Sequence, residues 1–151
     1  MDRPAVDGLR TVKLPVTELG RSLDWYRQVF GVVPEMEFPD EHAVVRGVVC
    51  SVPGLVGTGI SLREDPEAAR GYAGFDPMGW DVTDLPALEQ WAAFLDRLDV
   101  AHSPVIVASE GWLLTFRDPD GIGHHLYTRS THGIDPTGRP GTGRRVDQPA
   151  R

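Results

Sequence analysis

Several polar side chains on separate β-prone runs of the chain could carry chemistry. His125 and Tyr127 lie two residues apart, and alternate side chains of a strand share a face, so both project from the same side. Imidazole has an unperturbed pKa of about 6.5, so His125 is a natural proton carrier, although it could instead hydrogen-bond only to the backbone. Tyr127 could donate a hydrogen bond to a ligand oxygen, and Lys13 could act as an electrostatic partner. These three residues are the catalytic candidates.

Alternation along the strands also places further polar side chains on shared faces. Lys13 shares a face with Thr11, and Arg63 shares one with Ser61. Asp81 projects from another β-prone run. Such side chains around small residues would form a polar lining with room for an organic ligand that makes hydrogen bonds. A purely structural role is the alternative, in which Lys13 and Asp81 form an ion pair with each other.

An internal repeat defines the elements that must position these residues. Val16-Thr17-Glu18-Leu19 recurs as Val82-Thr83-Asp84-Leu85, and the same offset of 66 residues carries Trp25 onto Trp91. Each copy is typical of a strand that runs into an amphipathic helix.

The first copy predicts a strand over Thr11–Val16 and a helix over Leu19–Phe30, with Thr17 as N-cap and Gly31 as stop. The second predicts a strand over Met78–Val82 and a helix with an apolar stripe from Leu85 to Leu98, capped by Thr83 or Asp84. Further β-prone runs follow each helix: Ala43–Val45, Val48–Val52, Gly59–Arg63, and then Val105–Val107, Trp112–Phe116 and His124–Thr128. The pattern βαβββ appears twice, which predicts an α+β fold.

Two longer segments resemble the vicinal oxygen chelate superfamily of glyoxalases, bleomycin-resistance proteins and dioxygenases. Residues 14–26, LPVTELGRSLDWY, followed by Val29-Phe30-Gly31, are similar to its opening strand and helix. Residues 111–122, GWLLTFRDPDGI, are similar to its penultimate strand and Asp-Pro-Asp-Gly turn. With the repeat, the resemblance covers roughly residues 9–128. It implies two βαβββ modules forming a curved open sheet around a cleft, with helices outside, and it implies a homodimer.

The resemblance also allows a test for a metal site. Metal-dependent members hold a divalent ion with four residues, usually His, Gln or Glu, on the first and last strands of the modules. The aligned positions here are Thr11, Ser61, Pro77 and His125. Proline has no side-chain donor, neutral hydroxyls are poor ligands for such ions, and one imidazole does not give a tight site. We therefore expect no metal or other cofactor, with a site of Asp81, His125 and a third group as the alternative.

An aromatic residue completes the expected lining. Trp112 begins the strand before the Asp-Pro-Asp-Gly turn and could stack on a flat ligand, as the resemblance to antibiotic-sequestering proteins suggests. Trp80 and His124 alternate away from the cleft and are expected to be structural. The predicted ligand-binding set is Thr11, Lys13, Ser61, Arg63, Asp81, Trp112, His125 and Tyr127.

Composition narrows the classes of partner. The 151 residues carry a net charge of −7, which argues against nucleic acid as the main partner. No apolar run approaches the roughly 20 residues of a membrane span, and no apolar stretch typical of a signal peptide follows the first residues. Cys50 is the only cysteine, so we expect no internal disulfide and a cytoplasmic location.

The division of the chain follows the repeat. We assign residues 1–8 to a lead, 9–66 to the first module, 67–130 to the second, and 131–151 to a Gly/Pro/Arg-rich tail. Residues 129–151 carry a charge of +3, from five arginines and two aspartates, so the remainder carries −10. We expect the tail to be flexible or to pack on a partner subunit.

The sequence favours a metal-free small-molecule binding protein of the glyoxalase/bleomycin-resistance type, one that sequesters an aromatic or peptidic compound. The first alternative is a metal-independent isomerase, cyclase or lyase that uses His125 as acid or base. The second is a divalent-metal glyoxalase/dioxygenase-like enzyme with non-standard ligands. If a reaction is catalysed, a lyase or isomerase is favoured over a dioxygenase.

Overall fold

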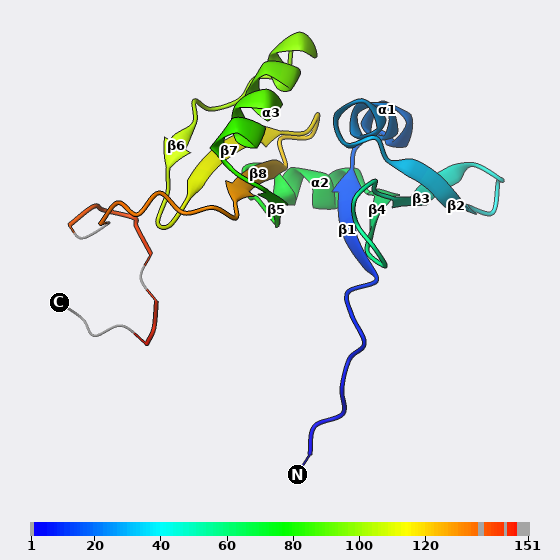
Figure 1. Ribbon diagram of the computed structural model, residues 1–151. Coiled ribbons are helices and arrows are strands. Elements are labelled where there is room, and N and C mark those ends of the chain that lie inside the picture. Colours follow the sequence, from blue (N-terminus) through cyan, green and yellow to red (C-terminus); the bar gives the residue numbers. More distant parts are fainter. Residues whose placement is uncertain (1, 136–137, 144, 148–151) are drawn as a thin grey trace. The chain divides into compact units, whose positions relative to one another are not determined.

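A computed structural model describes residues 2–135, 138–143 and 145–147 of the chain. The βαβββ order appears twice, as predicted, with one additional short helix between the two copies. In chain order the elements are β1 (Thr11–Val16), α1 (Leu19–Phe30), β2 (Val33–Pro39), β3 (Val45–Ser51), β4 (Gly59–Glu64), α2 (Pro66–Tyr72), β5 (Met78–Val82), α3 (Leu85–Arg97), β6 (Ile106–Val107), β7 (Trp112–Arg117) and β8 (Gly123–Thr128) (Figure 1).

The chain divides into two compact units. Unit 1 comprises residues 1–75 and 118–122, and unit 2 comprises 76–117 and 123–151. Each unit has one four-stranded mixed sheet, in the order β1-β4-β3-β2 or β5-β8-β7-β6. The first and last strands of each copy are parallel neighbours, and the remaining pairs are antiparallel. The α+β class with two βαβββ modules is confirmed, and the turn at 118–122 belongs to unit 1.

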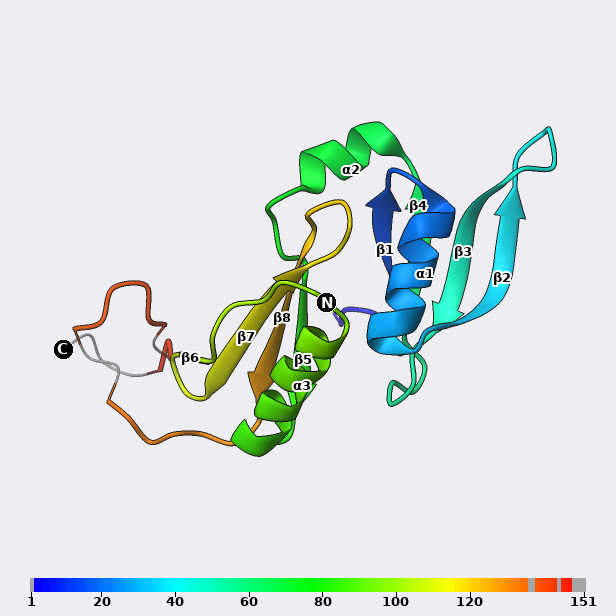
Figure 2. The same ribbon diagram turned by 90° about the horizontal axis from the view of Figure 1, so that it is seen from above.

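The core of unit 1 lies between α1 and one face of its sheet (Figure 2). Tyr26 of α1, Leu14 of β1 and Leu62 of β4 are fully buried there. Burying an aliphatic side chain of this size contributes about 1.5–3 kcal/mol, so this layer holds the sheet against the helix. Since side chains alternate along a strand, Lys13 and Ser61 project from the opposite face, which α1 does not cover.

Helix α1 is capped by carboxylates far away in the sequence. The predicted N-cap Thr17 is wrong, because Glu18 occupies that position and makes no side-chain capping bond. Instead the Thr17 N–H donates to Asp120 Oδ2 over 3.1 Å, and the N–H of the first helical residue donates to Glu64 Oε2 over 3.0 Å. The predicted stop is confirmed, since Gly31 has a φ of 66° and closes the last turn.

Strand β2 differs from the sequence-based expectation. The structure places a strand at Val33–Pro39, whereas the predicted run Ala43–Val45 falls mainly in the turn before β3, with Ala43 at a φ of 60°. Strand β2 is the edge of its sheet, where proline is tolerated and charged side chains can face solvent. Its pairing with β3 shifts at Glu35, which forms a bulge.

Unit 2 repeats the arrangement with α3 against one face of its sheet (Figure 2). Leu88 and Leu95 of α3 are fully buried, as are Leu114 of β7 and Leu126 of β8. Here the cap is local, as predicted, because Asp84 Oδ1 accepts the N–H of Ala87 over 3.0 Å. Strand β6 is shorter than the predicted Val105–Val107.

The described tail residues contact the loop between β6 and β7. The Gly143 N–H donates to Ser109 Oγ over 2.8 Å, and Arg145 forms an ion pair with Glu110 over 2.7 Å. Residues 136, 137, 144 and 148–151 lie outside the described residues, and the flexible or partner-bound tail stays a prediction.

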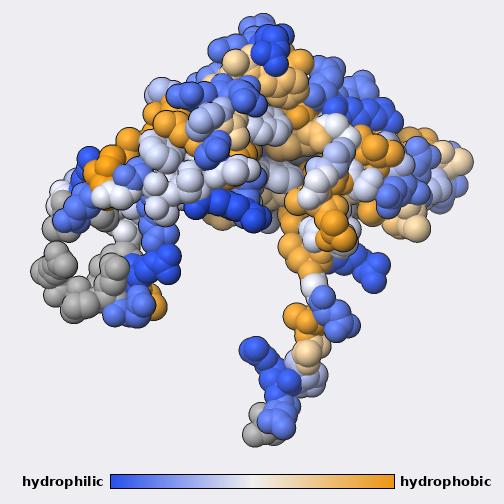
Figure 3. Space-filling view, viewed as in Figure 1, coloured by the Kyte–Doolittle hydropathy of each residue, from blue (hydrophilic) through white to orange (hydrophobic). Residues whose placement is uncertain are grey.

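Hydrophilic and hydrophobic residues are interspersed over the face in Figure 3. Within the described ranges, no helix is long and apolar enough to cross a membrane.

Candidate functional site

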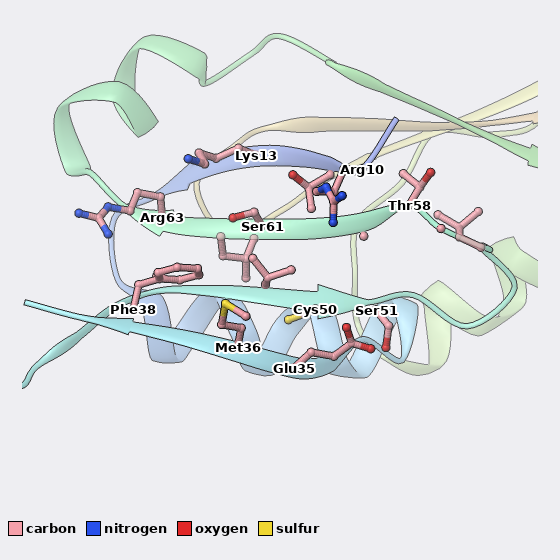
Figure 4. Close-up of a pocket in the computed structure, with 17 residues that line it drawn as sticks. Arg10, Lys13, Glu35, Met36, Phe38, Cys50, Ser51, Thr58, Ser61 and Arg63 are labelled. Carbon is pink, nitrogen blue, oxygen red and sulfur yellow. The ribbon is translucent and has the colours of Figure 1, made fainter. Parts of the chain in front are cut away.

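A pocket of about 770 Å³ lies on the face of the unit 1 sheet that α1 leaves uncovered (Figure 4). Its lining combines cationic, hydroxyl and apolar side chains from all four strands and the adjoining loops. The lining residues are Arg10, Thr11, Lys13, Glu35, Met36, Phe38, Gly47, Val49, Cys50, Ser51, Leu55, Gly57, Thr58, Gly59, Ser61, Leu62 and Arg63.

The strand register arranges this lining in rows across the sheet. Lys13 on β1 pairs with Ser61 on β4, which pairs in turn with Val49 on β3 and then Met36 on β2. Directly paired residues project from the same face of a sheet. One row of the pocket therefore changes from a cation, through a hydroxyl, to two apolar side chains.

A second row lies one pleat further along the strands. Arg63 pairs with Gly47, and Gly47 pairs with Phe38 on the edge strand. A side chain at Gly47 would meet Arg63 Cδ at 3.4 Å and Nη1 at 3.5 Å, so the arginine lies across the bare glycine backbone. This row also changes from cationic on β4 to aromatic on β2 (Figure 4).

Three cationic side chains at the pocket have no ion-pair partner among the described residues. Within the described part of the chain, Arg10, Lys13 and Arg63 form no ion pair within 4.0 Å. Other arginines of unit 1 behave differently, since Arg21 lies 3.1 Å from Asp120 and Arg46 binds the carboxylates of both Asp40 and Glu64. The acidic residue of the lining is Glu35, which projects from the bulge of β2.

Ser61 and Cys50 are the most buried polar and sulfur-containing residues of the lining. Ser61 is 6% exposed, and its hydroxyl has no hydrogen-bond partner among the residues that the structure describes, so it is available to a ligand. Cys50 is 1% exposed, and burial raises the pKa of its thiol. The thiol therefore stays protonated at neutral pH, and because Cys50 alternates with Val49 it lies on the side of the sheet that faces α1.

The corresponding face of the unit 2 sheet carries His125. Its Nδ1 lies 2.8 Å from Asp76 Oδ2, and 28% of its side chain is exposed. The ring lies over Gly79, its partner on β5, where a side chain would come within 2.5 Å of Nε2. The partner of His125 is therefore a carboxylate and not the backbone, and Gly79 is required for the position of the ring.

The other candidates of unit 2 bind groups of their own chain. Asp81 forms an ion pair with Arg129 over 3.1 Å, not with Lys13. Tyr127 Oη accepts the backbone N–H groups of Glu110 and Gly111 over 3.0 and 3.2 Å. The ring of Trp112 is half-buried and packs edge-on against His132, with centroids 5.6 Å apart.

His124 has the structural role that alternation predicts. It is fully buried, stacks on Phe116 with ring centroids 5.6 Å apart, and accepts the indole N–H of Trp80 at Nδ1 over 3.2 Å. Burial lowers the pKa of His124 to about 4, so the ring is neutral at pH 7.

The aligned metal positions do not provide a ligand set. Thr11 and Ser61 offer neutral hydroxyls in unit 1, while in unit 2 Pro77 offers no donor and His125 is held by Asp76. Among residues 2–135, 138–143 and 145–147, no three His, Cys, Asp or Glu side chains gather as a metal site would require. The donors do not fit a divalent ion such as Zn²⁺ or Fe²⁺.

The structure brings half of the predicted ligand-binding set into one pocket, namely Thr11, Lys13, Ser61 and Arg63. Asp81, Trp112, His125 and Tyr127 belong to the sheet of unit 2. Sequence reasoning missed the apolar half of the lining, Met36 and Phe38, because β2 was not predicted. Their spacing of two residues was the available signal for a shared face.

Comparison with solved structures reveals the fold. No family model matches the chain, and no curated protein matches its sequence. A glyoxylase/bleomycin resistance protein/dioxygenase domain from Frankia sp. EAN1pec is 22% identical, with a TM-score of 0.65 over 86% of this chain and 96% of that one. A lactoylglutathione lyase from Agrobacterium tumefaciens is 16% identical, with a TM-score of 0.67 over 87% and 100%. TnmS3, an antibiotic binding protein from Streptomyces sp. CB03234, is 19% identical, with a TM-score of 0.66 over 83% and 98%.

These likenesses confirm the sequence-based resemblance at the level of the fold. The chain has the fold of the glyoxalase/bleomycin resistance protein/dioxygenase superfamily. Proteins of this fold include both enzymes and antibiotic-binding proteins, so a function must be argued from the site.

Proposed function

We propose that this protein binds a small organic molecule without a metal ion, in the manner of the antibiotic-binding proteins that share its fold, and that it sequesters an aromatic or peptidic compound. The observation that carries the proposal is the pocket of unit 1. Its volume of about 770 Å³ falls within the range of small-molecule sites, and its lining joins an apolar wall to a few polar groups.

The chemistry of the lining supports binding over metal-dependent catalysis. The pocket offers hydroxyl, ammonium and guanidinium groups, with Glu35 as its carboxylate. Ammonium and guanidinium groups are hydrogen-bond donors that repel a cation. Such a site holds the polar atoms of an organic ligand through hydrogen bonds while Val49, Met36 and Phe38 cover its apolar surface.

A thermal-shift screen of chelator-treated protein tests this function. Ligands that bind the folded state and not the unfolded state raise the melting temperature in proportion to the logarithm of their concentration. We expect a concentration-dependent rise with at least one class among aromatic natural products and peptidic antibiotics. The Ser61→Phe substitution fills the pocket, so loss of the rise in this variant would show that the ligand binds in the pocket. A screen without any stabilising compound would count against the function.

A second function is favoured by the pairing of Asp76 with His125. A carboxylate at 2.8 Å orients an imidazole and fixes its tautomer, as general acid–base catalysis requires. The corresponding hypothesis is a metal-independent isomerase, cyclase or lyase with His125 as the acid or base. Given a substrate, His125→Ala protein that retains full turnover would exclude it, and Asp76→Asn should lower kcat more than it alters KM.

Elemental analysis addresses the remaining alternative, a metalloenzyme with non-standard ligands. Protein purified without chelator should contain far less than one divalent metal ion per chain. A stoichiometric, tightly held ion would overturn the metal-free proposal, and substitution of His125 and Asp81 would then show whether unit 2 holds it.

A further inference from the structure

The polar and apolar groups of the pocket are separated by strand. The cationic side chains Lys13 and Arg63 come from β1 and β4, whereas Met36 and Phe38 come from β2 at the opposite edge of the sheet (Figure 4). The register shows that both rows run in the same direction, from cation to apolar group. A ligand that satisfies both halves must carry its charge at one end.

The sign of that charge follows from the ion pairs of unit 1. Lys13 and Arg63 have no carboxylate partner in the described ranges, while Arg21, Arg27 and Arg46 of the same unit each have one. The chain as a whole carries −7, so a general attraction for anions is not expected. An anion would be attracted at this place because of the local cations alone.

Ser61 provides an independent indication of a ligand at the same place. Its side chain lies between Lys13 and Val49 in the register, is 6% exposed, and lines the pocket with a hydroxyl that has no partner among the described residues. Since no buried side-chain N or O atom of the described residues lacks a partner, this hydroxyl is reached from the pocket, where a ligand oxygen can form a hydrogen bond with it.

Building on the proposed function, we propose that the pocket selects organic anions with a flat apolar body. The acidic group, a carboxylate, sulfonate or phosphate, binds Lys13, Arg63 and the hydroxyl of Ser61. The apolar body lies over Val49, Met36 and Phe38. Guanidinium groups match the geometry of such oxyanions, and an aromatic ring on the edge strand provides a stacking surface.

A pair of fluorescent probes tests the proposal directly. 8-Anilinonaphthalene-1-sulfonate and N-phenyl-1-naphthylamine share one apolar body and differ by the sulfonate. We expect the sulfonate probe to bind about tenfold more tightly, and raising the salt from 0.02 to 0.5 M should weaken that probe alone. 1-Naphthoate and 1-naphthyl phosphate, competed against the sulfonate probe, identify which acidic group is preferred, with 1-naphthol as the neutral comparison.

Substitutions test whether Lys13, Arg63 and Phe38 account for the binding of the probes. Each of Lys13→Gln and Arg63→Gln should weaken binding of the sulfonate probe roughly three- to fivefold, as expected for partly exposed charge pairs, and leave the neutral probe within twofold. Phe38→Ala should weaken both probes. Arg70→Gln, which removes an exposed charge of α2 outside the pocket lining, is the matched control and should change neither. Far-UV circular dichroism checks that each variant is folded.

The outcomes separate this inference from the proposed function. If both probes bind equally, and the charge variants alter neither, the selection for anions is wrong while binding in the pocket stands. If neither probe nor any naphthalene compound binds the folded wild-type protein, the selection for flat organic anions is wrong, and the thermal-shift screen decides the proposed function separately.

Discussion

The two units of this protein share one topology but use the equivalent face of their sheets differently. Lys13 beside Ser61 in unit 1 corresponds to Gly79 beside His125 in unit 2. In unit 1 the side chains at this face surround a pocket, and three of its cations form no ion pair with any residue that the structure describes. In unit 2 the comparable groups are paired, His125 with Asp76 and Asp81 with Arg129.

The pairing of these polar groups decides how readily each could bind a ligand. A polar group that is paired within its own chain must give up that partner to bind a ligand, whereas a group that is bonded only to water exchanges the water for the ligand. On that ground we propose that unit 1 binds the ligand and that Asp81 and Tyr127 of unit 2 are mainly structural.

Acid should destabilise unit 2 through His124. The pKa of this histidine is about 4 in the folded protein, below its unfolded value of 6.5, so its contribution to stability is present above pH 6.5 and is lost as the pH falls toward 4. The loss should amount to about 3 kcal/mol of unfolding free energy. Urea unfolding at pH 7 and pH 4 measures it, and His124→Gln should remove most of the pH dependence.

Unit 1 has a comparable buried polar contact, in which the hydroxyl of Tyr26 donates a hydrogen bond to the carboxylate of Asp118 over 2.9 Å. Burial raises the pKa of the tyrosine well above its usual value, so it stays a donor at all ordinary pH. Tyr26→Phe would leave the carboxylate with only its two backbone donors, at a cost of about 1–3 kcal/mol in unfolding free energy. Chemical denaturation at pH 7 checks this, and an unchanged midpoint would show that the bond contributes nothing.

The two long helices should respond differently to loss of their N-cap residues. Asp84 caps α3 through its own side chain, so Asp84→Ala should lower stability by about 1 kcal/mol. Glu18 makes no capping bond, because Asp120 and Glu64 serve α1 from a distance, so Glu18→Ala should be nearly neutral. Equal losses in thermal unfolding would contradict this account of the caps.

The smallest effect is expected at the surface ion pair of unit 2. Asp81 and Arg129 are 63% and 74% exposed, and such pairs contribute at most about 1 kcal/mol. Asp81→Asn should change stability by less than that and leave binding of an anionic probe unaltered. A marked loss of probe binding would indicate that the probe binds to unit 2.

The sequence was sufficient to predict the bounds of the strands and helices whose apolar residues recur with strong periodicity. The strand Thr11–Val16, the helix Leu19–Phe30 and the strand Met78–Val82 have the predicted bounds because buried apolar residues recur at the spacing of each element. The inward alternation of Thr11, Lys13, Ser61 and Arg63 was also predictable from the pleat.

The features that the sequence did not predict depend on contacts between residues far apart in the chain. Strand β2 contains Pro34 and Pro39 and is largely exposed, so neither hydrophobicity nor propensity distinguishes it from a loop. The capping of α1 by Asp120 required the turn at 118–122 to be placed in unit 1. The partners of His125 and Asp81 likewise follow from the register of β5 and β8, which the sequence does not specify.

Titration of 1-naphthoate or 1-naphthyl phosphate into chelator-treated, ¹⁵N-labelled protein, followed by amide chemical shifts, tests the central claim most directly. At 16.6 kDa the chain is well suited to this measurement. We predict saturable shifts at Lys13, Val49, Ser61 and Arg63, and little change at Gly79, Asp81, His125 and Tyr127. Shifts confined to the second group, or no shifts at saturating ligand, would contradict the assignment of binding to unit 1.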